Sequence, residues 1–315
     1  MVTLPALTSR VLAIAAIAVT IAPSARAQVP SDARQGEQWA VAPGALLDLP
    51  GAWELSQGAG AVVAVIDTGT RLEHPDLAQN VWVNFDEVPG NGVDDDHNGY
   101  VDDVHGVDLT KTAPSQDLSD GNGHGTHVAG TIAAAADGRG VVGVAPKAKI
   151  MTVKALDAAG AGTTSAVAEG IRYAAANGAR VINMSLGGDQ PDPRLQEAIA
   201  AAAAANVLVI CSAGNSARNI DQQPSFPVSV PAPNLIGVAA TAPSEGRSLS
   251  GFSNFGQLTV ALAAPGERVL STSSDGTFTT MSGTSMAAPH VAGVAALIVA
   301  VRPDLPAIDL SLIHI

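Results

Sequence analysis

The sequence predicts an α/β protein of three layers, with a mostly parallel β-sheet lying between two layers of helices. Short runs of apolar, largely β-branched residues alternate with longer helix-like runs, and this alternation is typical of a parallel sheet covered on both faces. The run at 61–66 is continuously apolar, as expected of a strand that is buried on both sides. Five strands are expected at 61–66, 149–154, 180–184, 207–210 and 235–240, and four helices at 124–136, 163–177, 193–205 and 284–301.

The first 27 residues have the pattern of a secretory signal peptide. Arg10 precedes an apolar stretch from Val11 to Ile21, and an Ala-Arg-Ala sequence ends at Ala27. The stretch is too short for a membrane span, and the small residues suit a cleavage site. We therefore expect a secreted or periplasmic protein, free of the membrane after cleavage, with one domain over residues 28–309.

The amino-acid composition of the chain limits the classes of partner that it can bind. The 315 residues carry a net charge of −13 and 47% of them are hydrophobic. A chain of this size can bury one large core, and an acidic chain does not bind nucleic acid non-specifically. The only cysteine, Cys211, lies in an expected strand, so it is expected to be a small buried residue and not part of a disulfide framework.

The first expected strand ends at Asp67, followed by Thr68 and Gly69. Sites in open α/β sheets lie outside the carboxyl ends of the strands, so this carboxylate is a candidate site residue. The first expected helix begins in Gly-His-Gly-Thr-His-Val-Ala-Gly-Thr, residues 123–131, with His124 at its start. The glycines of this segment let the backbone approach neighbouring chain closely.

The last expected helix opens with Ser-Gly-Thr-Ser-Met-Ala-Ala-Pro-His, residues 282–290, and continues as an apolar run to Val301. Ser285 is therefore expected at a helix N-terminus, where free N–H groups and the helix dipole stabilise negative charge. Taken alone, a Gly-Thr-Ser turn before a helix is most often an N-cap. With Asp67 and His124, however, Ser285 completes the parts of a nucleophilic relay of carboxylate, imidazole and hydroxyl.

The order Asp67, His124, Ser285 is the order known from subtilisin. The three motifs that hold these residues resemble those of the subtilases, the subtilisin-like serine proteases. The resemblance extends from about Gln38 to Val301. The resemblance implies a subtilisin-like fold and an endopeptidase that acts on polypeptides in extended conformation. It also implies roles for Ser285 as nucleophile, His124 as general base, Asp67 as the group that orients His124, and Asn215 as an oxyanion donor.

The same resemblance identifies candidate substrate-binding residues. Ser185, Leu186 and Gly187 follow an expected strand and resemble the edge along which subtilase substrates pair, although for the next residue, Gly188, a plain glycine-rich loop stays open. The residues that precede Asn215 are the second candidate group: Ser212, Ala213 and Gly214.

Two stretches are predicted to bind calcium. The first, residues 94–103, holds five aspartates within ten residues, and its spacing resembles a calcium loop with the following ligands: Asp94, Asp96, Asn98, the carbonyl of Tyr100, and Asp102 or Asp103. It is not an EF-hand, because the twelfth position is His105 and not glutamate. A solvated acidic loop is the alternative, and zinc is disfavoured by the hard oxygen ligands.

The second calcium site is implied by the resemblance alone. Bacterial subtilases hold a calcium ion between an N-terminal glutamine, the aspartate of a His-Pro-Asp-Leu motif and a loop after the catalytic-histidine helix. The matching residues here are Gln38, Asp76 and Asp137.

The ends of the chain depart from the family pattern. Only about ten residues separate the expected cleavage site from Gln38, so we expect either that a long pro-domain is lacking or that the start of the gene is misassigned. Residues 310–315 equal one reading frame of a transposon adaptor used in sequencing libraries, so they are expected to be a scar on a C-terminally truncated domain.

We expect a monomer. The competing functions are a catalytically silent binding protein with the same fold, and a non-peptide acyl hydrolase.

Overall fold

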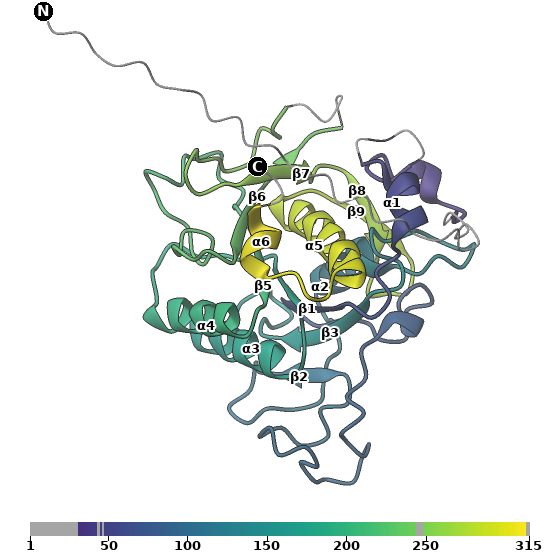
Figure 1. Ribbon diagram of the computed structural model, residues 1–315, viewed down its shortest axis with the longest axis vertical. Helices are drawn as coiled ribbons and strands as arrows, with labels where there is room; N and C mark the ends of the chain where they lie inside the picture. The colour runs from purple at the N-terminus through teal and green to yellow at the C-terminus, as the bar shows by residue number, and fades with distance from the viewer. Residues whose placement is uncertain (1–30, 43–44, 46, 244–247, 313–315) are drawn as a thin grey trace, which may run out of the picture.

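A seven-stranded parallel sheet forms the centre of the computed structural model, with the strand order β2-β3-β1-β4-β5-β6-β7 (Figure 1). The structure describes residues 31–42, 45, 47–243 and 248–312, and the predicted signal peptide lies outside them. The strands span Val62–Asp67 (β1), Gly106–Asp108 (β2), Lys149–Lys154 (β3), Val181–Met184 (β4), Leu208–Ser212 (β5), Leu235–Thr241 (β6) and Leu262–Pro265 (β7). The predicted α/β class is confirmed.

Helices cover both faces of the sheet because side chains alternate along each strand. Val63 and Val65 of β1 join a core with α2 (His124–Ala133) and α5 (Thr284–Val301). Ala64 and Ile66 of the same strand face α3 (Thr164–Ala176) and α4 (Pro193–Ala204). The three predicted layers are therefore present, with α2 and α5 together on one side and α3 and α4 on the other (Figure 1).

The remaining elements are short. They are α1 (Leu49–Leu55), α6 (Ala307–Leu312), two 3-10 turns (Gln35–Glu37 and Ala78–Asn80), and an antiparallel hairpin of β8 (Val269–Thr272) and β9 (Phe278–Met281). The hairpin packs on α2, where Ser271 and Thr272 donate hydrogen bonds to carbonyl groups of the helix. Leu310 and Ser311 of α6 are buried against the body of the domain; the predicted origin of residues 310–315 stays a prediction.

Local chemistry explains where the helices begin. The Thr163 hydroxyl accepts from Ala166 N (3.1 Å) and Asp192 accepts from Arg194 N (2.9 Å), so α3 and α4 both have side-chain N-caps. Among the described helices, α5 is the one long and apolar enough to cross a bilayer, but 67% of it is buried inside the fold. Its apolar composition is accounted for by its position in the core.

Candidate active site

Three neighbouring strands deliver the predicted site residues to one edge of the sheet. β1 pairs with β4, and β4 pairs with β5, all in parallel. Asp67 ends β1, Ser185 follows β4, and Asn215 lies three residues beyond β5. The chain passes from β1 to β3 on one side and then to β4 on the other, so the topological switch point where ligands bind in such sheets lies at β1.

Asp67 and His124 are in direct contact. His124 Nδ1 lies 2.7 Å from Asp67 Oδ1, which also accepts from the Thr68 backbone N–H at 2.7 Å. The carboxylate is fully buried, whereas the His124 side chain is 25% exposed. A bond to a carboxylate places the imidazole proton on Nδ1, so Nε2 is left as a proton acceptor.

The approach of α2 to this turn depends on one glycine. A Cβ atom on Gly125 would lie 2.1 Å from the Gly69 carbonyl oxygen, which is far inside van der Waals contact. Only glycine therefore lets the first turn of α2 pack against the chain that follows Asp67, and this packing brings His124 to the carboxylate.

Asp120 is a site residue that the sequence analysis missed. Its buried carboxylate accepts from Gly123 N (2.7 Å), Thr126 N (2.8 Å) and the hydroxyls of Thr126 (2.7 Å) and Thr68 (2.8 Å). It thus caps α2 in place of an N-cap side chain and ties the helix to the end of β1. An aspartate four residues before a helix histidine has no distinctive sequence pattern, so only the fold identifies it.

Burial and charge act in opposite directions on the pKa of His124. Burial disfavours the imidazolium, but the charge and hydrogen bond of Asp67, with a smaller contribution from Asp120, favour it, and the net effect raises the pKa above its usual value. The pKa of two other histidines, His127 and His290, is lowered to about 4 by burial. Of these three, His124 is therefore the one whose pKa is raised and not lowered.

The resemblance implies that His124 is a general base, and a general base must be neutral to accept a proton. We therefore predict that activity is lost as the pH falls through this raised pKa. The midpoint of the acid limb of kcat/KM should lie above about 6.5, the usual value for histidine. Asp120→Asn removes a negative charge that favours the imidazolium, so its midpoint should move to lower pH. The measurement is kcat/KM for a neutral peptide between pH 5 and 9.

The matched control is Asp117→Asn, which removes an equal charge from an exposed position of the same loop. Water screens exposed charges strongly, so this variant should keep the parental midpoint. An equal midpoint in the parent and Asp120→Asn would show that Asp120 does not act on His124.

Ser285 is the second residue of α5, and Pro289 shapes its surroundings. Proline has no N–H, so the Ser285 carbonyl cannot receive the usual hydrogen bond from four residues along the helix. The Ser185 hydroxyl donates to this carbonyl instead, at 2.8 Å, and the Ser285 hydroxyl donates to the Ser185 carbonyl at 3.2 Å. Two reciprocal bonds therefore join the start of α5 to the chain after β4.

Asn215 lies beside the same helix N-terminus. Its side-chain oxygen accepts from the Thr284 backbone N–H (2.8 Å) and from the Thr284 hydroxyl (2.9 Å). A Cβ atom on Gly283 would lie 3.3 Å from Asn215 Nδ2, so the absence of a side chain there gives the amide room. These bonds fix the orientation of the amide and leave its NH₂ group directed away from Thr284.

A cleft of about 420 Å³ runs past His124. Two chain segments form its sides, residues 160–164 and residues 185–188, and Val167, Leu195 and Phe226 contribute apolar lining. The predicted residues Ser185, Leu186 and Gly187 therefore lie in the cleft. The other predicted group, residues 212–214, is not part of its lining; Ser212 and Ala213 are buried at the end of β5.

The residues around Asp76 are not the same set as the sequence predicts for the second metal site. Asp76 accepts from Val141 N at 2.9 Å, and Asp32, which the sequence analysis missed, accepts from Gly138 N at 2.5 Å. Burial raises the pKa of Asp32 to about 6, and the nearby charges of Asp137 and Asp76 add to this effect. The Gln38 amide instead bonds both the N–H and the carbonyl of Val142.

Asp137 lies at the edge of this group, where its carboxylate pairs with Arg139 at 2.6 Å. Asp32 Oδ2 and Asp76 Oδ1 are buried, and neither has a hydrogen-bond partner among the described residues. These two oxygens are therefore available to a cation.

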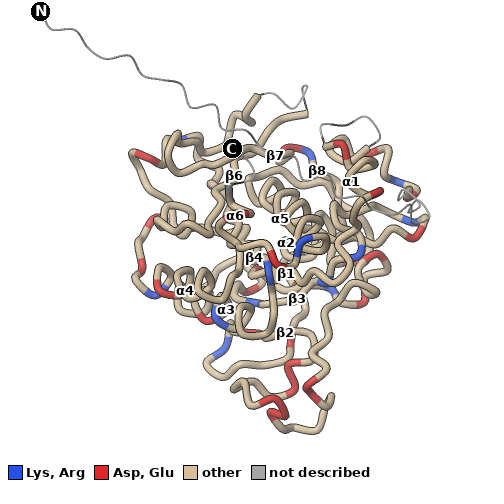
Figure 2. The backbone as a smooth tube through the Cα atoms, viewed as in Figure 1, with Lys and Arg blue, Asp and Glu red and all other residues tan. Residues whose placement is uncertain are grey.

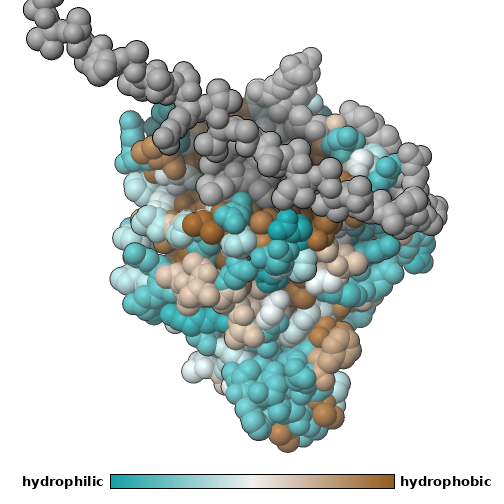
Figure 3. All heavy atoms as spheres, viewed as in Figure 1, coloured by the Kyte–Doolittle hydropathy of each residue, from teal (hydrophilic) through white to brown (hydrophobic). Residues whose placement is uncertain are grey.

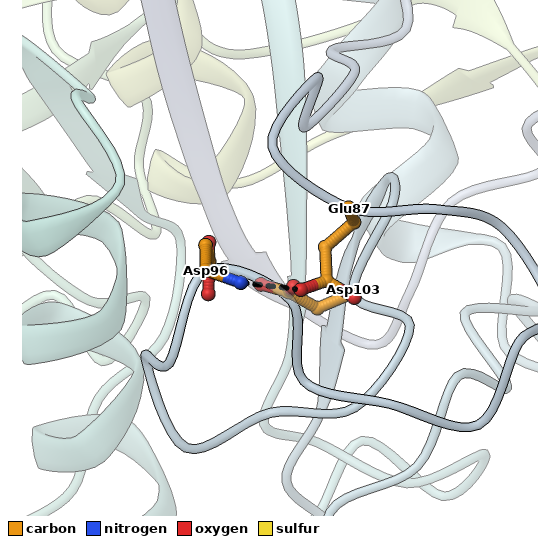
Figure 4. A group of neighbouring side chains, drawn as sticks. All are labelled: Glu87, Asp96 and Asp103. Atoms are coloured by element: carbon orange, nitrogen blue, oxygen red, sulfur yellow. Dashed lines mark hydrogen bonds between the residues drawn. The ribbon is translucent and has the colours of Figure 1, made fainter.

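The predicted ligands in the acidic loop are also separated into two groups. Carboxylate oxygens of Asp96 and Asp103 lie within 4.8 Å of one another and of Glu87, a residue that the sequence analysis did not select. Asp94 instead accepts from Asn98 N (3.0 Å) and Gly99 N (2.9 Å), and so it shapes the turn. Figure 2 shows the acidic residues gathered on the segment that projects beside β2, whose surface is mainly hydrophilic with a few apolar side chains (Figure 3). Glu87 reaches toward Asp96 and Asp103 from a different part of the loop (Figure 4).

Asn98 and Tyr100, which are predicted to supply two other ligands in this loop, also make side-chain hydrogen bonds. The Asn98 amide donates to Asp96 Oδ2 (3.0 Å) and Asp103 Oδ2 (3.1 Å), so it bridges the two carboxylates. The Tyr100 hydroxyl donates to Glu169 of α3; the ligand predicted from this residue is its carbonyl oxygen, which stays a prediction.

Comparison with known proteins gives consistent matches over most of the chain. The model of the Subtilase family (Peptidase_S8) matches residues 58–311. Thermitase of Thermoactinomyces vulgaris is 39% identical over 258 residues, which are 80% of this chain and 79% of thermitase. An intracellular serine protease of Paenibacillus polymyxa is 40% identical over 253 residues, 80% of this chain and 71% of that protein.

A solved structure agrees with the fold. The crystal structure of a cold-adapted subtilisin-like serine proteinase superposes with a TM-score of 0.66 at 37% identity, covering 81% of each chain. The segments described above, from β1 to α6, lie almost entirely within the residues that match the family model.

Proposed function

The chain belongs to the subtilase family and is a serine-type endopeptidase, and on this basis we propose that Ser285, His124 and Asp67 carry out its chemistry. The 2.7 Å contact between His124 and the buried Asp67 is the observation that carries the proposal. It is supported by the packing of α2, which begins at His124, on α5, which has Ser285 in its first turn. Asp67 holds the imidazole in the tautomer that leaves Nε2 free to act as a base.

In the first step, the Ser285 hydroxyl turns from the Ser185 carbonyl toward His124 and attacks the carbonyl carbon of the substrate. Its proton passes to His124 Nε2, and the imidazolium then donates that proton to the leaving amine. The peptide C–N bond breaks, and an ester between Ser285 and the acyl half of the substrate remains. Water hydrolyses this ester by the same proton transfers in reverse.

The tetrahedral intermediate carries a negative charge on the former carbonyl oxygen. We assign its stabilisation to the NH₂ group of Asn215 and the backbone N–H of Ser285. The Asn215 oxygen is held by Thr284, so the amide donor is oriented before substrate arrives. The N-terminus of the 18-residue helix α5 adds a favourable dipole.

The cleft favours an extended polypeptide as substrate. Residues 160–163 and Gly187 are exposed along its two sides, and we propose that backbone groups there pair with an added strand of substrate. Apolar residues line the cleft between them, which suits side chains of the substrate. An esterase for small acyl groups has no need of such a strand-shaped cleft, and a silent binding protein has no need of the Asp67–His124 pair.

Digestion of a mixed peptide library, with sequencing of the products, tests this function directly. We expect cleavage within peptides, and we expect a covalent serine inhibitor to block it. Hydrolysis of small esters without any peptide cleavage would favour the acyl hydrolase, and the absence of both activities would favour the silent protein. The same products would give the side-chain preference.

We also propose secretion through the predicted signal peptide of residues 1–27, and a monomeric mature domain from residue 28. Relatives named as subtilisins and one named as an intracellular protease leave the compartment to experiment. Expression of the full chain in a bacterial host, with N-terminal sequencing of the protein from the medium, tests cleavage after Ala27. Light scattering of the same material tests the monomer.

Calcium is the proposed structural cofactor, and the group around Asp76 fits it. Asp32 Oδ2 and Asp76 Oδ1 are buried there without a hydrogen-bond partner among the described residues. The other oxygen of each carboxylate accepts from the loop at 137–141, through Gly138 N and Val141 N. Carboxylate and carbonyl oxygens are the ligands that calcium prefers. Asp32 replaces Gln38 in the proposed ligand set, with Asp76, and Asp137 is kept as a peripheral member.

We predict that calcium raises the melting temperature, because a ligand that binds only the folded state stabilises it by mass action. At one hundred times the dissociation constant the gain is about 2.7 kcal/mol, or several degrees for a domain of this size. Calorimetry of the inactive Ser285→Ala protein, with EDTA and then with calcium, measures the gain without autolysis.

Asp76→Asn and Asp32→Asn should each lose much of this response. Asp117→Asn, which removes an exposed charge far from the loop at 137–141 in sequence, should keep it. A melting temperature that is the same in EDTA and in calcium would contradict the proposed cofactor.

A further inference from the structure

The loop that carries Asn215 is bonded to a second segment, residues 252–255, which lies between β6 and β7. Two backbone hydrogen bonds join the segment to the chain after Asn215: Ala217 N–H to the Phe252 carbonyl (2.9 Å) and Phe255 N–H to the Arg218 carbonyl (3.0 Å). A third bond, from the Asn254 N–H to the Gly214 carbonyl at 2.9 Å, holds the residue directly before Asn215. The segment therefore supports the loop on both sides of Asn215.

The side chain of Asn254 adds three further bonds to the same loop. Its Oδ1 accepts from the N–H groups of Ser216 (2.9 Å) and Arg218 (3.1 Å), and its Nδ2 donates to the Ala213 carbonyl at 2.8 Å. Asn254 is 1% exposed, and burial of an amide is costly unless its polar atoms are bonded. These bonds therefore explain why an asparagine can be buried here.

Two neighbouring residues fix the place of this amide. The Ser253 hydroxyl accepts from the Ala240 N–H of β6 at 2.9 Å and donates to the Asn254 carbonyl at 2.9 Å, so the amide is anchored to the central sheet. A Cβ atom on Gly214 would lie 2.4 Å from Asn254 Nδ2, far inside van der Waals contact, and Gly214 has a φ of 100°. Glycine at this position therefore lets the amide lie close against the loop.

Thr284 and Asn254 hold different parts of the oxyanion loop. Thr284 donates from its N–H and its hydroxyl to the side-chain oxygen of Asn215. Asn254 instead bonds the backbone of residues on either side of Asn215. The first contact orients the Asn215 amide, and the second fixes the main chain from which that amide extends.

We propose that Asn254 is a positioning residue for catalysis, which places the main chain around Asn215 so that the amide donor meets the oxyanion. The inference rests on the oxyanion role proposed for Asn215 and extends it to a residue outside the cleft lining. Such a donor must point at the place where charge develops. A displacement of about 1 Å can cost about 100-fold in rate, so the loss of this support should be visible in turnover.

Steady-state kinetics of Asn254→Ala on one peptide substrate tests the proposal. The variant should lower kcat by about tenfold or more. The loss should not exceed that of Asn215→Ala, about 100- to 1000-fold, because the effect passes through Asn215. KM should stay nearly unchanged, since the donor meets a full charge only in the transition state.

Asn234→Ala is the matched control for burial and residue type. Asn234 is also 1% exposed, and its amide donates to the Val207 carbonyl at 2.8 Å, at the end of β5 away from Asn215. Its loss should lower the melting temperature, measured in the Ser285→Ala background, but should keep the parental kcat. An equal fall of kcat in Asn234→Ala and Asn254→Ala would show a general effect of destabilisation and would overturn the proposal.

A double variant separates this inference from the one on which it rests. Asn254→Ala introduced into Asn215→Ala should change kcat by no more than about twofold, because the group that Asn254 positions is then absent. Losses that multiply would mean that Asn254 acts independently of Asn215, against the proposal. An unchanged kcat in Asn215→Ala itself would contradict the oxyanion role and this inference together. An unchanged kcat in Asn254→Ala, beside a low kcat in Asn215→Ala, would refute the positioning role alone.

Asn254→Asp is the second variant, for the case in which alanine at this position prevents folding. Aspartate keeps an acceptor for the N–H groups of Ser216 and Arg218 but sets an oxygen, in place of a donor, against the Ala213 carbonyl. We expect kcat to fall in this variant too, by less than in a folded Asn254→Ala. A parental kcat in Asn254→Asp would count against the proposal.

Discussion

Replacement of Ser285 by alanine should abolish proteolysis and covalent labelling by a fluorophosphonate. The hydroxyl is the one group that forms a bond with the substrate in the proposed mechanism, so no other residue can replace it. Subtilisin, a relative of this chain, loses about 2 × 10⁶-fold in kcat when its nucleophile is removed, and that known loss sets the expected scale. Labelling is measured by mass spectrometry of the modified peptide.

The matched control for this experiment is Ser282→Ala. Ser282 lies three residues earlier in the same segment, is exposed, and accepts from Arg268 N at 2.9 Å. Its loss should leave both activity and labelling close to the parental level. Labelling of the Ser285→Ala protein at another serine would refute the assigned nucleophile, and so would an active variant.

The central fold could be predicted because its information is local. β1, β3, β4, β5 and β6 are each built around a short apolar run, and their observed ends differ from the predicted ones by at most two residues. The same holds for α3, α4 and α5, whose apolar faces or compositions are long enough to recognise. The helix predicted at 124–136 ends at Ala133, where the next residue turns to an extended conformation.

Short elements were missed because they have too few residues for a pattern. β2 has three residues, and α1 contains both Pro50 and Gly51, which disfavour a helix in a sequence-based reading. β8 and β9 are rich in serine and threonine, and the buried hydroxyls of Ser271 and Thr272 in β8 are explained by their bonds to carbonyl groups of α2. These elements exist because of tertiary contacts.

The same distinction applies to the candidate site. Asp67, His124, Asn215 and Ser285 sit in short motifs at the ends of strands and the starts of helices, so adjacent residues identify them. Asp32 and Glu87 have no such motif. The Asp32 carboxylate meets Gly138 across 106 residues of chain, and no spacing rule in the sequence predicts that contact.

Gln38 illustrates the opposite case, in which a family resemblance suggests a role that the contacts do not favour. Its amide makes two hydrogen bonds to the backbone of Val142, at 2.9 and 3.0 Å, and a third to the Leu270 carbonyl at 3.4 Å. Both ends of the amide are therefore used to join the N-terminal segment to the core. Its assignment as a calcium ligand stays a prediction that Gln38→Glu could test in the same calorimetric experiment.

Replacement of Asn215 by alanine should lower kcat by about 100- to 1000-fold and leave KM nearly unchanged. The amide donor meets a full negative charge only in the tetrahedral intermediate, so its loss destabilises the transition state far more than the bound substrate. The magnitude is the one known for the corresponding loss in subtilisin, a member of the same family. Steady-state kinetics on one peptide substrate measures both constants.

Thr284→Val is the control that separates the donor from its support. It removes the hydroxyl that donates to the Asn215 oxygen but keeps the Thr284 backbone N–H, which donates to the same oxygen at 2.8 Å. The amide should stay roughly in place, so kcat should fall by much less than in Asn215→Ala. Equal losses in the two variants would mean that the Thr284 hydroxyl is needed to hold the Asn215 amide in place. An Asn215→Ala enzyme with unchanged kcat and raised KM would place Asn215 in substrate binding instead of oxyanion stabilisation.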